Sequence, residues 1–463
     1  MNYTWADHKM FGSPEGGILL GVDHASLFFV DAATREIISR WEEQPRVDLH
    51  AVPQIDREVL EGLRDARILV PRGESGRPKS PRIGPGAVPL STMVLEVAQD
   101  CNLRCTYCYA EGGSYGKPGR LLDPGSARQA VRTLIERSGE LETVTLILFG
   151  GEPLLNLPAL RAAVAEAEKG GKAAGKKVNL SLTTNGTLLG PEAIDFIRRH
   201  RVTVSVSMDG PPDLHDANRP TRNGEGSYRS ILENLAPLLK DSPAPVAARV
   251  TLVPDQWSRV EEVFDHLMAI GFHEVGIAPA SPIRRELLPD PGQEEALLQG
   301  FAAMADRFLA HARQGRVLPF SNLIDLLARL HLGRTKSVSC GAGLGYLAVD
   351  AEGDFYLCHR LAGDPAFRVG TLAGGPEPET ARAVLDGLNA GLDTLCEGCW
   401  ARTLCSGGCH YENHLRGSHL RLPLGSSCNF IRSWLQAGIQ TYAELRHAEC
   451  DQILRLFEKR VAC

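Results

Sequence analysis

Short apolar runs alternate with longer amphipathic segments between about residues 92 and 282. The runs have the length of β-strands, whereas the segments between them have the length and the apolar spacing of helices. This alternation predicts repeated βα units and therefore a parallel sheet. The predicted strands are 92–98, 143–149, 178–183, 202–207, 246–253 and 273–279, and the predicted helices are 124–137, 157–169, 191–200 and 228–239. We expect an α/β fold whose centre is a partial (β/α)6 barrel similar to a TIM barrel.

The first 70 residues show a different pattern. Alternating apolar positions in 17–21 and 26–30 predict a hairpin. Asp31 is expected to cap a helix that presents Ile38 and Trp41 on one face, and a second helix follows. Two strands with helices predict a winged-helix-like module. Many such modules bind DNA, but this one carries 7 Lys plus Arg against 12 Asp plus Glu, a charge of −5 that would repel phosphate.

Residues 71–89 contain five prolines and four glycines, which predicts a linker. A chain of 463 residues is long enough for two or three packed units. The expected organisation is a recognition module (1–70), the linker (71–89), the barrel (90–285), a helical bridge (286–335), a Cys-rich domain (336–440) and a C-terminal helix (441–463).

Charge and hydropathy exclude several classes of function. The net charge of −6 argues against binding to nucleic acid or to anionic lipid. The longest apolar stretch, 144–149, is far shorter than the ~20 residues that a membrane span needs. The N-terminus has neither a basic segment nor an apolar one, so no secretion signal is expected. We therefore expect a cytoplasmic location, where thiols stay reduced.

The chain contains 12 cysteines, most of them in two groups. In a reducing compartment, clustered thiols favour metal ligation over disulfides. Cys101, Cys105 and Cys108 follow the first barrel strand with the spacing C-x3-C-x2-C, and three thiolates on one loop suit a four-iron cluster that keeps one iron open. The second group is Cys340, Cys358, Cys396, Cys399, Cys405, Cys409 and Cys428. From spacing alone, the inner four of these could also form a zinc ribbon.

With Tyr107 in its aromatic position, the first triplet resembles the signature of the radical S-adenosylmethionine (SAM) enzymes. The run Gly150-Gly151-Glu152 after the second strand resembles the family's site for the methionine amino group of SAM. By the same resemblance, Ser207 in an S-x-D-G-P run is expected to contact the ribose of SAM, and Arg219 its carboxylate. Arg249 is a weaker candidate.

The second group of cysteines resembles the SPASM domain, an auxiliary-cluster module of radical enzymes that modify peptides. The resemblance implies an outer cluster on Cys396, Cys399, Cys405 and Cys428 and an inner cluster on Cys340, Cys358 and Cys409. With the cluster of the first triplet, this gives three 4Fe-4S clusters. Residues 341–357 contain no further Cys, so the fourth inner ligand is absent, borrowed or of another type. Cys450 and Cys463 lie outside every motif.

Residues 1–70 resemble leader-peptide recognition elements, which add an extended peptide to a strand edge. Together with residues 112–116, they make the chain similar to maturases that form Cys-to-carbon thioethers, such as the quinohemoprotein amine dehydrogenase maturation proteins. The resemblance implies a 5′-deoxyadenosyl radical that abstracts hydrogen from a precursor peptide or a small Cys-containing protein. An electron donor such as flavodoxin or ferredoxin is implied too.

Several alternatives remain open from the sequence. Asp209 and His215 are candidates for the base that accepts the thiol proton. A maturase that forms carbon–carbon (cyclophane) crosslinks would contain the same modules. A non-catalytic iron-sulfur or zinc scaffold that only binds peptides would also carry clustered cysteines.

Overall fold

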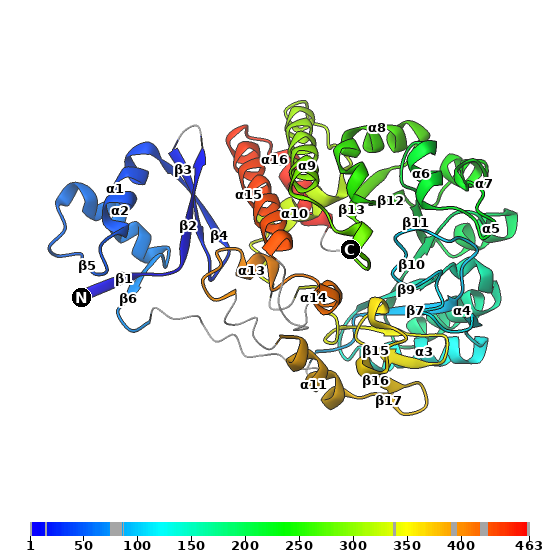
Figure 1. Ribbon diagram of the computed structural model, residues 1–463. Helices are drawn as coiled ribbons and strands as arrows, with labels where there is room; N and C mark the ends of the chain where they lie inside the picture. Colours follow the sequence, from blue (N-terminus) through cyan, green and yellow to red (C-terminus); the bar gives the residue numbers. More distant parts are fainter. Residues whose placement is uncertain are drawn as a thin grey trace.

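The computed structural model describes residues 2–13, 16–74, 86, 88–336, 339–389, 396–416 and 425–460 (Figure 1). Its centre is a mixed sheet with the strand order β13-β12-β11-β10-β9-β7-β14-β15-β16-β17. The α/β class predicted from the sequence is therefore confirmed. None of the described helices is long and apolar enough to cross a bilayer.

All six predicted barrel strands are present and pair in parallel. They are β7 (Thr92–Gln99), β9 (Thr143–Gly150), β10 (Lys177–Thr184), β11 (Thr203–Ser207), β12 (Val246–Leu252) and β13 (Glu274–Pro279). The helices that connect or flank them are α3 (Pro124–Arg137), α4 (Leu157–Ala173), α5 (Pro191–Arg199), α6 (Pro212–Asn218), α7 (Tyr228–Lys240) and α8 (Val260–Ile270). The predicted helices fall on α3, α4, α5 and α7.

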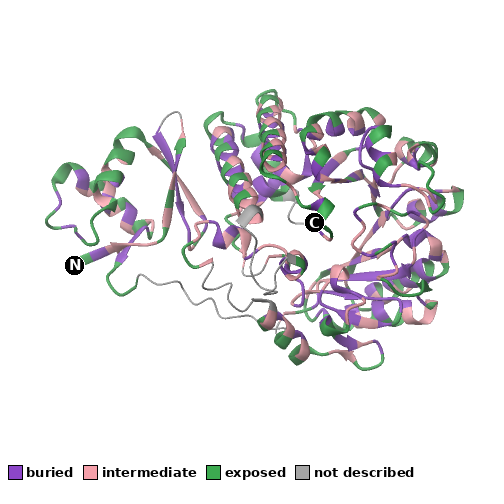
Figure 2. Ribbon diagram, viewed as in Figure 1, coloured by how far each residue is buried: buried purple, intermediate pink, exposed green. Residues whose placement is uncertain are grey.

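The two faces of this sheet differ in burial (Figure 2). In β9, Val144, Leu146 and Leu148 are fully buried, whereas Ile147 and Phe149, which alternate with them, are only half-buried. Successive side chains of a strand point to opposite faces, so one face is packed under helices and the other is not. The less buried face also carries polar side chains, among them Ser181, Thr183, Ser205, Ser207 and Arg249. A face of this kind can receive a polar ligand.

The sheet continues into the Cys-rich part of the chain. Strand β14 (Tyr346–Val349) pairs in parallel with β7, so that Tyr346 lies opposite Thr92. Antiparallel strands β15 (Asp354–Tyr356), β16 (Arg368–Thr371) and β17 (Gly375–Pro376) extend it further. The barrel and the segment that carries Cys358 therefore share one sheet.

Helices α9 (Pro291–Ala312), α10 (Ser321–His331), α15 (Gly425–His447) and α16 (Asp451–Arg460) pack together beside the barrel (Figure 1). A capping box between Asp290 and Gln293 starts α9. The ring of Phe301 in α9 lies edge-on to Trp434 of α15, 4.9 Å between centroids. The expected C-terminal helix falls on the end of α15 and on α16, and Cys463 lies outside the described residues. Most of the predicted linker does so too.

The N-terminal module has two small sheets and two helices. The predicted hairpin is β3 (Gly16–Gly21) with β4 (Ser26–Asp31), and the Asp31 carboxylate accepts from the Thr34 amide (2.7 Å) at the start of α1 (Ala32–Glu42). The pattern also indicates α2 (Gln54–Asp65). It misses β1 (Asn2–Trp5), β2 (His8–Ser13), β5 (Val47–Asp48) and β6 (Leu69–Pro71), which are short and rich in polar or small residues.

The module is fixed to the Cys-rich segment. Phe11 lies edge-on to Trp400, 5.1 Å between ring centroids. The buried Arg402 guanidinium pairs with Asp7 (2.6 Å) and Asp23 (2.5 Å). Arg402 lies between Cys399 and Cys405 in the sequence. The N-terminal module therefore contacts the segment that carries these two thiols.

Candidate functional site

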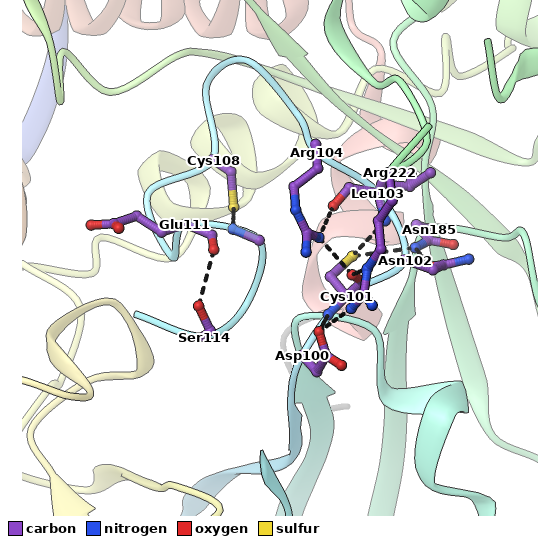
Figure 3. Close-up of polar contacts among 11 residues, drawn as sticks. Asp100, Cys101, Asn102, Leu103, Arg104, Cys108, Glu111, Ser114, Asn185 and Arg222 are labelled. Carbon is purple, nitrogen blue, oxygen red and sulfur yellow. Dashed lines mark hydrogen bonds and ion pairs between the residues drawn. The ribbon is translucent and has the colours of Figure 1, made fainter. Parts of the chain in front are cut away.

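The first Cys triplet lies on the loop after β7, and Figure 3 shows two of its members, Cys101 and Cys108. The Cys101 sulfur accepts from the Leu103 amide (3.4 Å) and from Asn185 Nδ2 (3.6 Å). The Cys108 sulfur accepts from the Gly112 amide (3.3 Å). Donors of this kind favour thiolates over thiols.

Two arginines hold the loop in place (Figure 3). Arg104 Nη1 donates to the carbonyls of Cys101 (2.7 Å) and Leu103 (2.8 Å). Arg222 Nε donates to the Cys101 carbonyl (2.9 Å), and its guanidinium pairs with Asp100. The backbone that presents the thiols is therefore held by the protein itself.

The thiols of the triplet act on one another. The pKa of Cys101 is raised to about 12, mainly by burial, and the charges of Glu152 and Cys105 act in the same direction. Burial also raises the pKa of Cys105, which Arg219 lowers and Cys108 raises. Such thiols ionise only where positive charge is supplied, as iron supplies it. The donor set fits the cluster that the sequence predicts.

Glu152 lies at the turn after β9 and is fully buried. Thr184 Oγ1 and the Asn185 amide each donate to its carboxylate at 2.7 Å. Burial is the main cause that raises the pKa of Glu152, to about 7. An ammonium group bound here would favour the carboxylate form, which is the partner predicted from the sequence.

The glycines beside Glu152 permit a close approach of three loops. A Cβ on Gly150, whose φ is +146°, would lie 2.3 Å from the Ala98 carbonyl oxygen. A Cβ on Gly151 would lie 2.3 Å from the Asp100 oxygen and 2.7 Å from the Gly113 Cα. Gly113 belongs to the segment 112–116. This segment therefore packs against the Gly150-Gly151-Glu152 turn and against Asp100, which precedes the Cys triplet.

Replacing Gly151 with Ala is expected to destabilise the protein by about 1–3 kcal/mol, because backbone must shift to admit the methyl group. Thermal unfolding measures the change. The matched control is Gly62→Ala in α2, where a Cβ has nothing within 4 Å and the gain in helix propensity is up to about 1 kcal/mol. Equal melting temperatures for Gly151→Ala and the unmodified chain would contradict the close packing.

Tyr107, Asp209 and Arg219 form a buried polar cluster beside the triplet. The Tyr107 hydroxyl donates to Asp209 Oδ2 (2.5 Å) and accepts from Arg219 Nη1 (2.5 Å). Asp209 Oδ1 accepts from the Thr251 amide (3.0 Å). Arg219 Nε is buried and has no hydrogen-bond partner. That unpartnered donor fits an anionic ligand such as the carboxylate of SAM.

His215 is fully buried and uses both ring nitrogens. Its Nδ1 accepts from the Asp209 amide (3.3 Å), and its Nε2 lies 3.0 Å from Ser227 Oγ. Ser227 donates its own proton to the Arg219 carbonyl (2.6 Å), so Nε2 is the donor to Ser227 and the ring is neutral. Burial, with the charge of Arg219, lowers the pKa of His215 to about 3. This geometry favours a positioning role for His215.

The remaining predicted SAM contact, Ser207, lies half-buried on the less packed face of β11. Arg249, opposite Ser207 in β12, is exposed on the same face. Both side chains thus lie on the face that is open to a ligand.

The second Cys group forms two neighbourhoods, and none of the described cysteines is in a disulfide. The pKa of Cys358 is raised to about 12, mainly by burial, and the charges of Cys340 and Cys409 act in the same direction. Burial also raises the pKa of Cys428, on which Cys405 and Cys399 act in the same direction. Cys340 and Cys409 thus lie near Cys358, and Cys399 and Cys405 lie near Cys428.

The sequence did not single out a buried network around Glu96 in β7. The Tyr115 hydroxyl lies 2.8 Å from both Glu96 Oε1 and the His359 carbonyl. One hydroxyl proton cannot serve both acceptors, whereas a protonated Glu96 can donate to Tyr115 while Tyr115 donates to His359. Burial raises the pKa of Glu96 to about 8. The available signal was a Glu within an otherwise apolar strand.

Because the folded state raises this pKa, Glu96 contributes stability that is complete below about 4.5 and is lost as the pH rises through about 8. One pKa unit corresponds to about 1.4 kcal/mol. Chemical unfolding between pH 5 and 9 should therefore show a smaller decline for Glu96→Gln than for the unmodified chain. Glu136→Gln, on the exposed side of α3, is the control. Parallel pH profiles for Glu96→Gln and the unmodified chain would contradict this contribution.

Comparison with known proteins shows two levels of similarity. Residues 95–267 match the model of the Radical SAM superfamily. The chain is 24% identical over 410 residues to a serine-type anaerobic sulfatase-maturating enzyme of Klebsiella aerogenes, covering 80% of this chain and 94% of that protein.

Two solved structures share the fold. Native anSMEcpe with bound AdoMet superimposes with a TM-score of 0.65 at 19% identity, over 77% of this chain and 99% of that one. Streptococcus suis SuiB bound to precursor peptide SuiA gives 0.53 at 13% identity, over 92% and 99%. A share of 92% cannot leave out all of residues 1–70, so the likeness to SuiB reaches the N-terminal module. Residues 95–267 thus resemble the Radical SAM superfamily, and most of the chain is similar to anaerobic sulfatase-maturating enzymes.

Proposed function

We propose that the chain is a peptide maturase that joins a Cys thiol of its substrate to a carbon atom as a thioether. The observation that carries this proposal is the arrangement of the second Cys group. Its inner set has three thiols, Cys340, Cys358 and Cys409, and the loop 341–357 contains no fourth. An inner cluster with an open iron would have room for the thiolate of a substrate.

The first site would hold its cluster on Cys101, Cys105 and Cys108. SAM would lie beside it, with its amino group on Glu152, its carboxylate on Arg219 and its ribose near Ser207. When bound, the reduced cluster supplies the electron that cleaves SAM to methionine and a 5′-deoxyadenosyl radical. Tyr107 and Asp209 hold the Arg219 guanidinium in place through the contacts described above.

The overall reaction would pass a hydrogen atom from the substrate carbon to the 5′-deoxyadenosyl radical, release the thiol proton to water, and pass the remaining electron to an auxiliary cluster. A carbon–sulfur bond replaces the C–H and S–H bonds. Asp209 accepts hydrogen bonds on both oxygens and His215 uses both nitrogens. We therefore assign both residues to positioning, and assign proton acceptance to neither.

The N-terminal module would bind the substrate peptide. Both β2 and β4 are edge strands of the sheet β2-β3-β4, and an edge can accept an extended peptide. The local charge of −5 disfavours nucleic acid. SuiB, whose fold this chain shares, is bound to a precursor peptide. A small reductant such as flavodoxin or ferredoxin would supply electrons to the clusters.

A second candidate is maturation of a sulfatase-like protein, which the homology to sulfatase-maturating enzymes favours. A carbon–carbon crosslinking maturase and a non-catalytic peptide-binding scaffold are further readings of the same modules. Of these functions, the proposed thioether formation is the one in which the substrate thiolate would bind at the inner set of cysteines.

Electron paramagnetic resonance (EPR) of the reduced full-length protein tests the proposal. The probe is a Cys-containing substrate peptide, with its Cys→Ser form as the matched control. The Cys peptide should change the signal of one auxiliary cluster, and the Ser peptide should not. Identical spectra with both peptides, when both bind, would contradict ligation of the inner cluster by the substrate thiolate.

A further inference from the structure

Arg360 packs against two aromatic rings near the inner set of thiols. Its guanidinium carbon is 5.0 Å from the ring centre of Tyr109 and 4.6 Å from that of Tyr411. Only 22% of its side chain is exposed. A guanidinium that packs against two aromatic rings and is largely buried is a fixed positive charge with little freedom to move.

The same residue contacts two thiols of the inner set. Its backbone amide donates to the Cys358 sulfur (3.4 Å), and Nη1 donates to the Cys409 sulfur (3.8 Å). Nη2 donates to Ser281 Oγ, and Nε is buried without a hydrogen-bond partner. Two donors of Arg360 are therefore directed at inner thiols, and a third at Ser281.

One carboxylate offsets part of this charge. Glu412 Oε1 lies 3.7 Å from Arg360 Nη1 and accepts from Ser281 Oγ (2.7 Å). Glu412 is half-buried, with 28% of its side chain exposed. The local field on the inner thiols is thus the balance of one buried cation and one half-buried anion.

The aromatic partners connect the two centres. Tyr109 follows Cys108 of the first triplet, and Tyr411 lies two residues after Cys409. The two rings also lie edge to face, 5.7 Å between centroids. Tyr109, Arg360 and Tyr411 form one packed unit between the radical site and the inner set.

We propose that Arg360 sets the reduction potential of the inner auxiliary cluster, by placing a fixed positive charge and two donors against its thiolates. The proposal rests on the function proposed above, since it requires a cluster on Cys340, Cys358 and Cys409. Reduction adds one electron and makes or breaks no bond, so a nearby cation favours the reduced form. Hydrogen bonds to the sulfurs and local charge are general determinants of cluster potentials.

A redox titration of the full-length, iron-loaded protein with dithionite, followed by EPR, tests this role. Arg360→Met should move the midpoint potential of one auxiliary cluster to a more negative value and leave the other two clusters unchanged. Arg360→Lys, which keeps the charge, should restore part of the shift. The control is Arg368→Met, at a side chain that is 53% exposed and paired with Asp354.

Glu412→Gln provides a measurement that keeps Arg360 in place. Loss of the anion should move the same midpoint potential in the positive direction, opposite to Arg360→Met. Unchanged potentials with full iron content, or shifts of the same sign in both variants, would overturn the role of Arg360. Absence of inner-cluster iron from the unmodified protein would instead overturn the proposed function.

Discussion

Replacing Cys101, Cys105 and Cys108 together with Ala is expected to abolish cleavage of SAM while iron remains bound to the second Cys group. The three thiols lie on one loop, which Arg104 and Arg222 hold in place, and no other described cysteine belongs to it. The second group lies on different elements, so its iron should survive. Liquid chromatography of 5′-deoxyadenosine and an iron assay measure the two effects.

The matched control is Cys450→Ala. Cys450 is a buried cysteine outside both groups, and its thiol donates to the Ala448 carbonyl (3.7 Å). This variant should cleave SAM at the rate of the unmodified chain. Formation of 5′-deoxyadenosine by the triple variant would show that the first triplet is not the radical site.

Replacing Arg219 with Met is expected to weaken SAM binding by on the order of 100-fold, since a charged partner is worth about 3 kcal/mol when it is lost from a buried site. The loss has two causes. The SAM carboxylate would have no cation, and Tyr107 would no longer be held between Arg219 and Asp209. Calorimetric titration of the iron-loaded protein with SAM measures the affinity.

Arg229→Met is the control for this prediction. Arg229 lies ten residues further along the chain, is 92% exposed and pairs with Glu233 on the surface of α7. Its loss should leave the protein folded, because exposed ion pairs contribute at most ~1 kcal/mol to stability. SAM affinity should also stay unchanged, because Arg229 is not among the predicted SAM contacts. Full SAM affinity in a folded Arg219→Met protein would exclude Arg219 from the SAM site.

The strands of the barrel could be predicted because their signal is local. Runs such as that of β9 are apolar and flanked by helical patterns, and all six were placed from the sequence. The pairing of β14 with β7 could not be predicted, because its partners lie far apart in the chain. Ser91 Oγ, for instance, donates to the Gly345 carbonyl across 254 positions.

The candidate site also has parts that could be predicted from the sequence and parts that could not. The spacing of the Cys triplet and the Gly150-Gly151-Glu152 run are local patterns, so the sequence indicated them. The partners of Glu96 and Arg360 come from distant segments: Tyr115 bonds to His359 across 244 positions, and Arg360 reaches Tyr109 of the first loop. Contacts of this kind depend on the fold, and no spacing along the chain encodes them.

The proposed maturase reaction is tested most directly by mass spectrometry of the substrate peptide. The reduced, iron-loaded protein would be incubated with SAM and the Cys-containing substrate peptide, and then with an alkylating reagent. We expect 5′-deoxyadenosine and a peptide lighter by two hydrogen atoms whose Cys no longer reacts with the reagent. A bound peptide of unchanged mass, or one lighter by two hydrogen atoms with a reactive thiol, would contradict thioether formation.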